Sequence, residues 1–423
     1  MSSASLRFFG CIFCFSLFSA CVKQTPPPPV SSLPIKDVTE DKIKELIQEE
    51  EKETAPKHEI TKDVSPAGLK TVRVGLKPSV ESATISCDGS FEGRENSSKS
   101  VQRFPAGTYE IKSRSGKIIV GSNVLGKEVK FTPASPSRPM RSGSMDVRGS
   151  LLAVVVNGSQ FSVINELDVD SYLKGVLPRE VIVTWPKEAL KVQAVASRTY
   201  MASHMGRHNL EGFDICSEVH CQVYGGSSRE NPNTNQAVEE TKGQILVFEG
   251  KPIGAFFHAN CGGMTEQIQP VWGSSNLPYL PAKICRWGTE APWYNWSKEF
   301  SFDTILEDLK KKKLVEGSAL RSLSVKKKSH SGRTESVVIE TNKGSFTLSG
   351  NAFRLALHPE KVRSTLWTSL RKSSKGYQIE GKGWGHGVGL CQWGARGQAS
   401  AGKGYREILE FYFPHTKLVV WKE

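Results

Sequence analysis

This sequence has fewer acidic than basic side chains. Its 423 residues include 43 Asp and Glu against 56 Lys and Arg, which gives a formal net charge of +13 at pH 7. A basic chain implies an anionic partner, such as nucleic acid, an anionic lipid or an acidic cell-wall polymer. The sequence also lacks an internal repeat, which excludes a solenoid of repeated units. The length allows two or three domains of ordinary size.

A nucleotide-binding loop is lacking as well, although glycine is abundant near the C-terminus. The stretch GKGWGHGVG, residues 381–389, has Gly at every second position, whereas a dinucleotide loop needs Gly at i, i+2 and i+5. The segment GQASAGKG, residues 397–404, is Walker-like but has Gly404 where magnesium binding needs a hydroxyl. These spacings argue against a phosphate site.

The first 21 residues predict an exported protein. The apolar run at residues 8–20 is too short to cross a bilayer and fits the core of a secretory signal peptide. Ser19 and Ala20 directly before Cys21 resemble the bacterial lipoprotein cleavage box, in which the Cys21 thiol is acylated. We therefore expect a lipid anchor and an envelope location, on the periplasmic side of a membrane, which conflicts with a nucleic-acid partner. An ordinary signal peptide or a buried apolar segment are the alternatives.

Composition divides the rest of the chain. Residues 22–67 are rich in Pro and charge and have almost no aromatic residues, which predicts a disordered tether. From residue 68 to 144, short alternating runs broken by Gly, Asn, Asp and Pro predict a β-rich N-terminal subdomain. The remainder, 145–423, is expected to form the main domain.

One long helix and several hairpins are predicted in that main domain. Residues 185–205, WPKEALKVQAVASRTYMASHM, have Pro186 in the first turn and a slim face of small residues, which predicts a buried helix. Hairpin patterns are found at 149–167, 243–259 and 334–350. The predicted class is therefore α+β, with several antiparallel sheets packed around a buried helix.

The glycine stretch 381–389 reads best as a strand. Gly at alternate positions removes the side chains from one face, so a backbone or a ligand can approach closely. The other face then presents Trp384 and His386, which suit the apolar face and the hydroxyls of a sugar ring. A packed Trp and a satisfied His in an ordinary sheet–helix contact are equally compatible with the pattern.

Glu180 and a cluster of Cys and His are further candidates. Glu180 follows Pro178 in an expected loop, and apolar surroundings would raise its pKa towards that of a general acid, although exposed loop Glu residues are commoner. Within 14 residues lie four side chains that suit Zn²⁺, namely His208, Cys216, His220 and Cys221. An oxidising compartment favours a disulfide instead, either locally or with Cys87, Cys261, Cys285 or Cys391.

Five motifs in order resemble the stage II sporulation protein D (SpoIID/LytB) family. They cover roughly residues 145–420 and read NELDVDSYLKGVLPREVIVTWPKEALKVQAVASRTY, DICSEVHCQVYGG, GQILVFEGKPIGAFFHANCGGMTE, PVWGSSNLPYL and GKGWGHGVGLCQWGARGQA. Val181 and Cys391 depart from the family's usual Met and Ser. Residues 22–144 lie outside the resemblance.

The resemblance implies a peptidoglycan lytic transglycosylase with Glu180 as its single acid and base. Trp185 is then a candidate for the apolar wall beside Glu180, and expected substrate-binding residues are Gln193, Arg198, Trp384, His386 and Gln392. No cofactor is required for this chemistry, but the family allows a structural zinc at Cys216, His220 and Cys221.

The implied partners are peptidoglycan glycan strands, a cell-wall amidase that strips peptides from them, and a membrane through the lipid anchor. The resemblance leaves a second function open, because the LytB branch includes non-catalytic enhancers of a cell-wall amidase. Such a protein would bind glycan without cleaving it.

Overall fold

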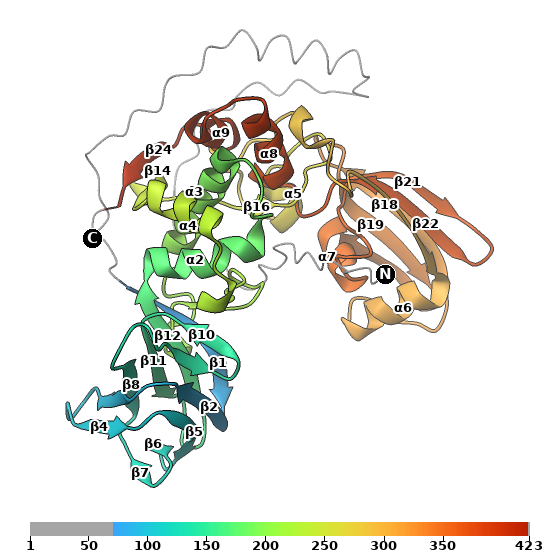
Figure 1. Ribbon diagram of the computed structural model, residues 1–423. Helices are drawn as coiled ribbons and strands as arrows, with labels where there is room; N and C mark the ends of the chain where they lie inside the picture. Colours follow the sequence, from blue (N-terminus) through green and yellow to red (C-terminus); the bar gives the residue numbers. More distant parts are fainter. Residues whose placement is uncertain (1–70, 422–423) are drawn as a thin grey trace, which may run out of the picture.

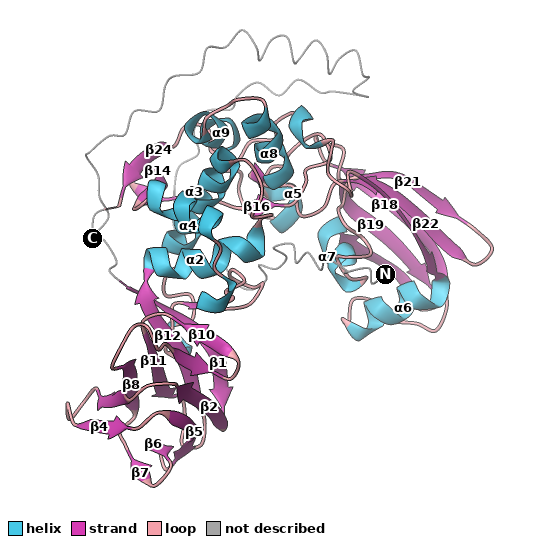
Figure 2. Cartoon of the chain, in the orientation of Figure 1, coloured by secondary structure: helices cyan, strands magenta, loops and turns pink. Residues whose placement is uncertain are grey.

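The computed structural model describes residues 71–421, which form three bodies (Figure 1). We call them the N-terminal β body (71–168), the helical body (169–294 with 390–421) and the C-terminal β body (295–382). The predicted signal peptide, Cys21 and the tether lie outside the described residues. Figure 2 shows helices concentrated in the helical body and separate sheets in the other two, so the predicted α+β class is confirmed. No helix among residues 71–421 is long and apolar enough to cross a membrane.

Two sheets pack against each other in the N-terminal β body. Their strands are β1 (Thr71–Val80), β2 (Ser82–Cys87), β3 (Phe91–Glu95), β4 (Val101–Phe104), β5 (Gly107–Arg114), β6 (Lys117–Val120), β7 (Asn123–Val124), β8 (Glu128–Pro133), β9 (Met140–Ser142), β10 (Met145–Val147), β11 (Ser150–Val155) and β12 (Phe161–Asp168). One sheet has the order β13-β1-β12-β11-β8-β3-β4, in which the short strand β13 (Ile215–Cys216) comes from the helical body. The other sheet has the order β10-β9-β2-β5-β6-β7. Inward-facing residues such as Ile85, Phe91 and Phe131 form their shared core.

This body extends beyond the expected boundary at residue 144. Strands β9 and β10 pair with each other across that position, and β11 and β12 complete the larger sheet. The predicted hairpin at 149–167 is confirmed, and its turn is closed by Asn157, whose Oδ1 accepts hydrogen bonds from the backbone N–H groups of Ser159 and Gln160.

The helical body is built around one buried helix, as predicted. Its elements are α2 (Val169–Glu180), α3 (Lys187–Ser203), η1 (Asn209–Glu211), β13 (Ile215–Cys216), η2 (Ser227–Arg229), α4 (Pro232–Glu240), β14 (Gln244–Phe248), β15 (Lys251–Pro252), β16 (Phe257–His258), α5 (Gln269–Trp272), η3 (Arg286–Gly288), β23 (Leu390–Cys391), α8 (Gln392–Ser400), α9 (Tyr405–Tyr412) and β24 (Lys417–Val420). Helix α3 contacts α2, α4, α8, α9 and β14, and ten successive residues, 192–201, are buried. Its Ala and Ser side chains permit these close approaches.

The C-terminal β body has a core of its own, which the sequence analysis did not separate from the main domain. Its elements are β17 (Asn295–Ser301), α6 (Phe302–Lys311), β18 (Leu320–Lys328), β19 (Thr334–Thr341), β20 (Gly344–Ser349), α7 (Gly350–Ala356), β21 (Trp367–Lys372) and β22 (Gly376–Lys382). The sheets β17-β22-β21 and β18-β19-β20 enclose one apolar cluster with α6 and α7, which includes Ile305, Val337 and Ile379.

The glycine stretch is not the strand that we expected. Strand β22 ends at Lys382, and the four glycines 383, 385, 387 and 389 have φ between +70° and +117°, which a regular strand does not contain. The expected close approach is present: a Cβ would lie 2.5 Å from Asn260 O at Gly383 and 2.4 Å from Phe256 O at Gly389. The alternating glycines here allow positive φ angles and close contact with the neighbouring backbone.

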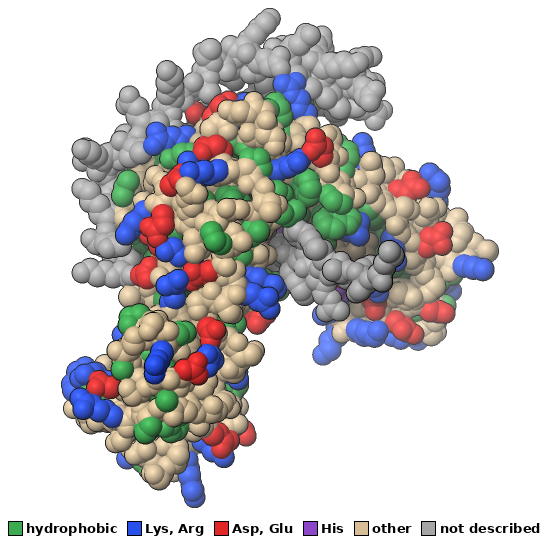
Figure 3. Space-filling model, in the orientation of Figure 1, with side chains coloured by type: hydrophobic (Ala, Val, Ile, Leu, Met, Phe, Trp, Pro, Cys, Tyr) green, Lys and Arg blue, Asp and Glu red, His purple; other side chains and the backbone are tan. Residues whose placement is uncertain are grey.

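The positive charge is distributed over the surface. On the face seen in Figure 3, Lys and Arg side chains lie over all three bodies and are interspersed with Asp and Glu. A spread of this kind favours diffuse attraction to a polyanion over a single docking patch.

Candidate active site

Glu180 is the last residue of α2, not part of a loop as the sequence suggested. Asp168 caps the start of this helix, where its Oδ1 accepts a hydrogen bond from the Ser171 N–H at 2.9 Å. Pro178 lies in the last turn, where its missing N–H and its ring hinder continuation of the helix, and the chain leaves as extended backbone at Val181. The helix end therefore fixes the direction of the Glu180 side chain.

The carboxyl group of Glu180 is buried and isolated. Its side chain accepts one backbone hydrogen bond, from the Val223 N–H to Oε1 at 3.2 Å, and the residue is 6% exposed. Burial raises the pKa of Glu180 to about 7, opposed by the Val223 N–H and by the charge of Arg179. Glu180 is thus poised to hold a proton near neutral pH and to release it.

Two glutamines from distant segments meet beside Glu180. Gln392, the first residue of α8, donates from Nε2 to the backbone carbonyl of Glu180 at 3.1 Å and to Gln193 Oε1 at 3.3 Å. Gln193 in turn donates to Ser197 Oγ at 3.1 Å. The structure therefore brings together three residues that we singled out from the sequence, Glu180, Gln193 and Gln392.

A pair of partly exposed indole rings lies next to these residues. Trp185 packs on the small cluster that contains Val181 and Leu190, and its ring centroid is 5.3 Å from that of Trp393, at an angle of 70°. Trp393 directly follows Gln392 in the chain. Sequence reasoning missed Trp393, although its position beside Gln392 in the motif CQWG was the available signal.

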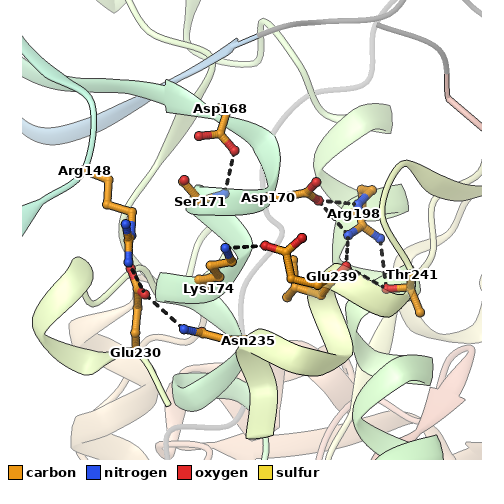
Figure 4. A network of polar contacts seen from close by, with 11 residues as sticks. Arg148, Asp168, Asp170, Ser171, Lys174, Arg198, Glu230, Asn235, Glu239 and Thr241 are labelled. Carbon is orange, nitrogen blue, oxygen red and sulfur yellow. Dashed lines mark hydrogen bonds and ion pairs between the residues drawn. The ribbon is translucent and has the colours of Figure 1, made fainter. Parts of the chain in front are cut away.

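Arg198 lies on α3 in a different environment. Figure 4 shows its guanidinium facing Asp170 and Thr241. The guanidinium donates hydrogen bonds to Asp170 Oδ1 at 2.8 Å, Val238 O at 3.2 Å, Thr241 Oγ1 at 3.4 Å and Gln244 O at 3.3 Å. Arg198 is fully buried. These contacts join α2, α3 and α4, so the geometry gives Arg198 a structural part, and its substrate binding stays a prediction.

Trp384 and His386 are also placed among protein contacts. The Trp384 ring is 4.7 Å from Trp293, and the Arg363 guanidinium lies 5.4 Å from its centroid. His386 Nε2 donates to the Phe257 carbonyl at 3.0 Å, while Nδ1 accepts from the Val388 N–H at 3.0 Å.

Both ring nitrogens of His386 are therefore engaged by the backbone, and burial lowers the pKa of His386 to about 3. No recorded contact among the described residues joins Trp384 or His386 to Glu180. Their substrate-binding roles stay predictions.

The Cys and His cluster assembles as four facing ligands. One ligand atom each from His208, Cys216, His220 and Cys221 lies within 4.8 Å of the others, and the Cys221 sulfur is 3.6 Å from both His208 Nε2 and His220 Nδ1. Cys216 and Cys221 are free thiols. Two thiols and two imidazoles at this spacing fit tetrahedral Zn²⁺, and they add His208 to the three ligands that the family resemblance implies.

An outer partner supports this fit. Glu211 Oε2 accepts from His208 Nδ1 at 2.5 Å, which leaves the other ring nitrogen, Nε2, facing the sulfur of Cys221. A carboxylate behind a ligating imidazole is typical of zinc sites. Cys221 of this cluster lies two residues before Val223, whose N–H donates a hydrogen bond to Glu180. A metal bound at the cluster would therefore fix the position of the segment that contacts the carboxyl group.

Comparisons with known proteins identify the family of this chain. A family described as stage II sporulation protein (SpoIID) matches residues 157–248, and a domain of unknown function (DUF8618) matches residues 282–389. An uncharacterized protein of Brachyspira hyodysenteriae is 38% identical over 272 residues, which are 64% of this chain and 72% of that protein. The chain belongs to the SpoIID family.

Two named relatives extend the SpoIID comparison. The amidase enhancer of Bacillus subtilis is 31% identical over 366 residues, which cover 74% of this chain but only 50% of that protein. Stage II sporulation protein D of the same organism is 26% identical over 300 residues, with 67% of this chain and 84% of that protein covered. The SpoIID match contains Glu180 and all four ligands of the Cys and His cluster, whereas Gln392 and Trp393 lie outside it.

Proposed function

We propose that this SpoIID protein is a peptidoglycan lytic transglycosylase that cleaves the bond between N-acetylmuramic acid and N-acetylglucosamine. The observation that carries the proposal is the buried carboxyl group of Glu180, which is held by the Val223 N–H and has a pKa raised to about 7. Hydrolytic glycosidases use two carboxylates. A lytic transglycosylase needs one, because its nucleophile is a hydroxyl of the substrate itself.

The proposed reaction uses the carboxyl group of Glu180 twice, first as an acid and then as a base. Protonated Glu180 donates to the glycosidic oxygen, so the N-acetylglucosamine chain leaves as an alcohol. The resulting carboxylate then takes the proton from the C6 hydroxyl of the muramoyl sugar, and that oxygen closes a 1,6-anhydro ring on C1. The acid form is restored without water, which suits a carboxyl group in an apolar site.

The neighbouring side chains fit the positioning of such a substrate. Gln392 holds the end of α2 in place, and the amides of Gln193 and Gln392 carry hydrogen-bonding groups suited to sugar hydroxyls and acetamido groups. The rings of Trp185 and Trp393 offer partly exposed apolar faces on which a sugar ring can stack. We assign His208, Cys216, His220 and Cys221 to a structural zinc, which would supply fold stability and no reaction step.

The relatives also support a place in the cell envelope. Their printed names describe an amidase enhancer and a sporulation protein, so we propose a cell-wall setting with peptidoglycan strands and a wall amidase as partners. Lipidation at Cys21 and a periplasmic side remain part of this proposal. A second candidate function, a non-catalytic enhancer of an amidase, rests on the match to the enhancer across 74% of this chain.

One experiment separates the two functions. The purified full chain is incubated with peptide-stripped glycan strands, and the products are analysed by mass spectrometry for anhydromuramoyl ends. We expect such ends from the wild type and from Glu249→Gln, a control at an exposed glutamate in the turn before β15, and none from Glu180→Gln. Strand binding without anhydro products from the wild type would contradict the enzyme. The enhancer function then predicts that wild type and Glu180→Gln accelerate a purified amidase equally.

A further inference from the structure

A second group of metal-binding side chains lies beside the glycine stretch, away from the first cluster. Cys261, Cys285 and Cys391 are buried free thiols, and His258 is buried with them. A ring nitrogen of His258 and the sulfurs of Cys261 and Cys391 lie within 4.8 Å of one another. The sulfurs of Cys285 and Cys391 flank the same residue, Gly394, where an added Cβ would lie 2.6 Å from the first and 3.2 Å from the second. Three ligand atoms thus form one group, and the Cys285 sulfur is the candidate for the fourth ligand.

We propose that these four residues form a second tetrahedral Zn²⁺ site, with three thiolates and one imidazole. Zinc takes closed Cys₃His sets at structural sites, with sulfur at about 2.3 Å and nitrogen at about 2.0 Å from the metal. The three grouped ligand atoms need a small contraction to reach that geometry, and Cys285 Sγ, which is not within 4.8 Å of all three, must move towards them. The proposal does not depend on the transglycosylase activity.

The state of the His258 ring supports coordination. Nδ1 lies 3.2 Å from the Val388 carbonyl, and because a carbonyl only accepts, Nδ1 must carry the hydrogen. Nε2 is then an acceptor with a free lone pair, and it is buried without a hydrogen-bond partner. A buried acceptor without a hydrogen-bond donor is unfavourable. A metal ion would satisfy Nε2, with the Val388 carbonyl as the outer partner that orients the ring.

Hydrogen-bond donors also point at the sulfurs. Cys391 Sγ accepts from the backbone N–H of Cys261 at 3.2 Å and of Gly394 at 3.3 Å, at the start of α8. Cys285 Sγ is 3.1 Å from the Tyr412 hydroxyl. Donors of this kind and a helix N-terminus stabilise a thiolate, which is the form that binds metal.

A buried cation next to the cluster balances its charge. Three thiolates, a neutral imidazole and Zn²⁺ carry one net negative charge. Arg333 is 2% exposed, donates from Nη2 to the Cys261 carbonyl at 2.5 Å, and has no partner at Nε or Nη1. An anionic metal cluster would therefore lower the cost of burying this guanidinium.

A disulfide is the competing arrangement in an exported protein. Any one bridge among the three sulfurs would leave a third thiol unpaired and leave His258 Nε2 without a partner. Metal coordination would give all three sulfurs and His258 Nε2 a partner. It also suits the region, because between β15 and β17 the chain has only β16, α5 and η3 as regular structure.

The metal site would fix the position of β23, the strand directly before Gln392, which contacts Glu180. It ties β16 to β23, which pair in parallel at His258 and Cys391, and both to Cys285 at the start of η3. Gln392 follows Cys391 directly. We therefore infer that the second metal fixes the start of α8.

The test is the zinc content of the purified full chain, measured by mass spectrometry of the metal for wild type, Cys285→Ser, Cys216→Ser and Cys87→Ser. We expect Cys285→Ser to lose one equivalent of zinc relative to wild type, whatever the first cluster holds. Cys216→Ser should retain the second-site zinc, and Cys87→Ser, at a lone buried thiol in the N-terminal β body, should lose none. An unchanged zinc content in Cys285→Ser overturns the proposal.

A measurement on the wild type alone covers the case in which Cys285→Ser does not fold. The chain is denatured with a chelator and without reductant, alkylated, and mapped by peptide mass spectrometry. A metal site predicts complete alkylation of Cys261, Cys285 and Cys391. Two of them remaining unmodified until a reductant is added would show a disulfide and refute the metal site.

Discussion

Gln392 Nε2 donates a hydrogen bond to the backbone carbonyl of Glu180 at 3.1 Å, across 212 residues of sequence. This bond joins the end of α2 to the start of α8, and it uses a carbonyl of the last turn of α2 that has no acceptor role inside the helix. The site therefore depends on contacts between segments that fold far apart in the chain.

Glu180→Gln should stabilise the protein at alkaline pH. The pKa of Glu180 is raised from 4.5 to about 7 in the folded state, so folding takes up a proton between these values and wild-type stability falls as the pH rises through them. Glutamine carries no charge and can keep the hydrogen bond from Val223. We expect the variant to be more stable by about 3 kcal/mol at pH 8 and equal to wild type at pH 4, measured by urea unfolding. A pH-independent difference would contradict the raised pKa.

Cleavage of glycan strands should fall as the pH rises above neutrality. Glu180 must be protonated to act first as an acid, and its pKa is raised to about 7. Trp185→Ala admits water near the carboxyl group, so the descending limb of the pH–rate profile should move to lower pH. Trp185→Phe keeps an apolar ring and should leave the limb near its wild-type position. An unshifted limb in Trp185→Ala would remove Trp185 from the wall around Glu180.

Trp393→Ala should weaken glycan binding, whereas Trp384→Ala should lower the stability of the fold. Trp393 is partly exposed beside Trp185, so its loss should weaken glycan binding about tenfold, or about 1.4 kcal/mol, with little change in stability. Trp384 is 6% exposed and packed on Trp293, so its loss should cost about 3–5 kcal/mol of folding free energy. Binding to immobilised glycan strands and urea unfolding measure the two effects. The reverse pattern would restore Trp384 as the sugar platform.

Local patterns in the sequence predicted the elements well. Alternating runs in residues 71–168 predicted the strands, and Pro186 with small apolar residues predicted α3, because both signals depend on neighbours in the chain. The glycine stretch misled us because alternate glycines are compatible with a strand and with a left-handed backbone, and only the neighbouring Asn260 and Phe256 backbone decides between them. The partners of Arg198 and the position of Trp393 are set by long-range packing, which periodicity does not contain.

Arg198 provides the sharpest test between a structural and a substrate-binding part. Its guanidinium is fully buried and binds Asp170 Oδ1 at 2.8 Å. Arg198→Met leaves the Asp170 carboxylate without its partner, and Asp170→Asn leaves a buried cation, so each should cost about 3–5 kcal/mol. The double variant should cost clearly less than the sum of the two, because no unpaired charge remains.

The activity of the variants that remain folded completes that test. If Arg198 acts only by joining α2, α3 and α4, Asp170→Asn and the double variant should keep the wild-type KM for glycan strands at a temperature well below their unfolding transitions. A substrate contact from Arg198 predicts instead a KM raised about tenfold in the double variant and unchanged in Asp170→Asn. Because Asp170→Asn retains the guanidinium, this comparison separates lost stability from lost substrate binding.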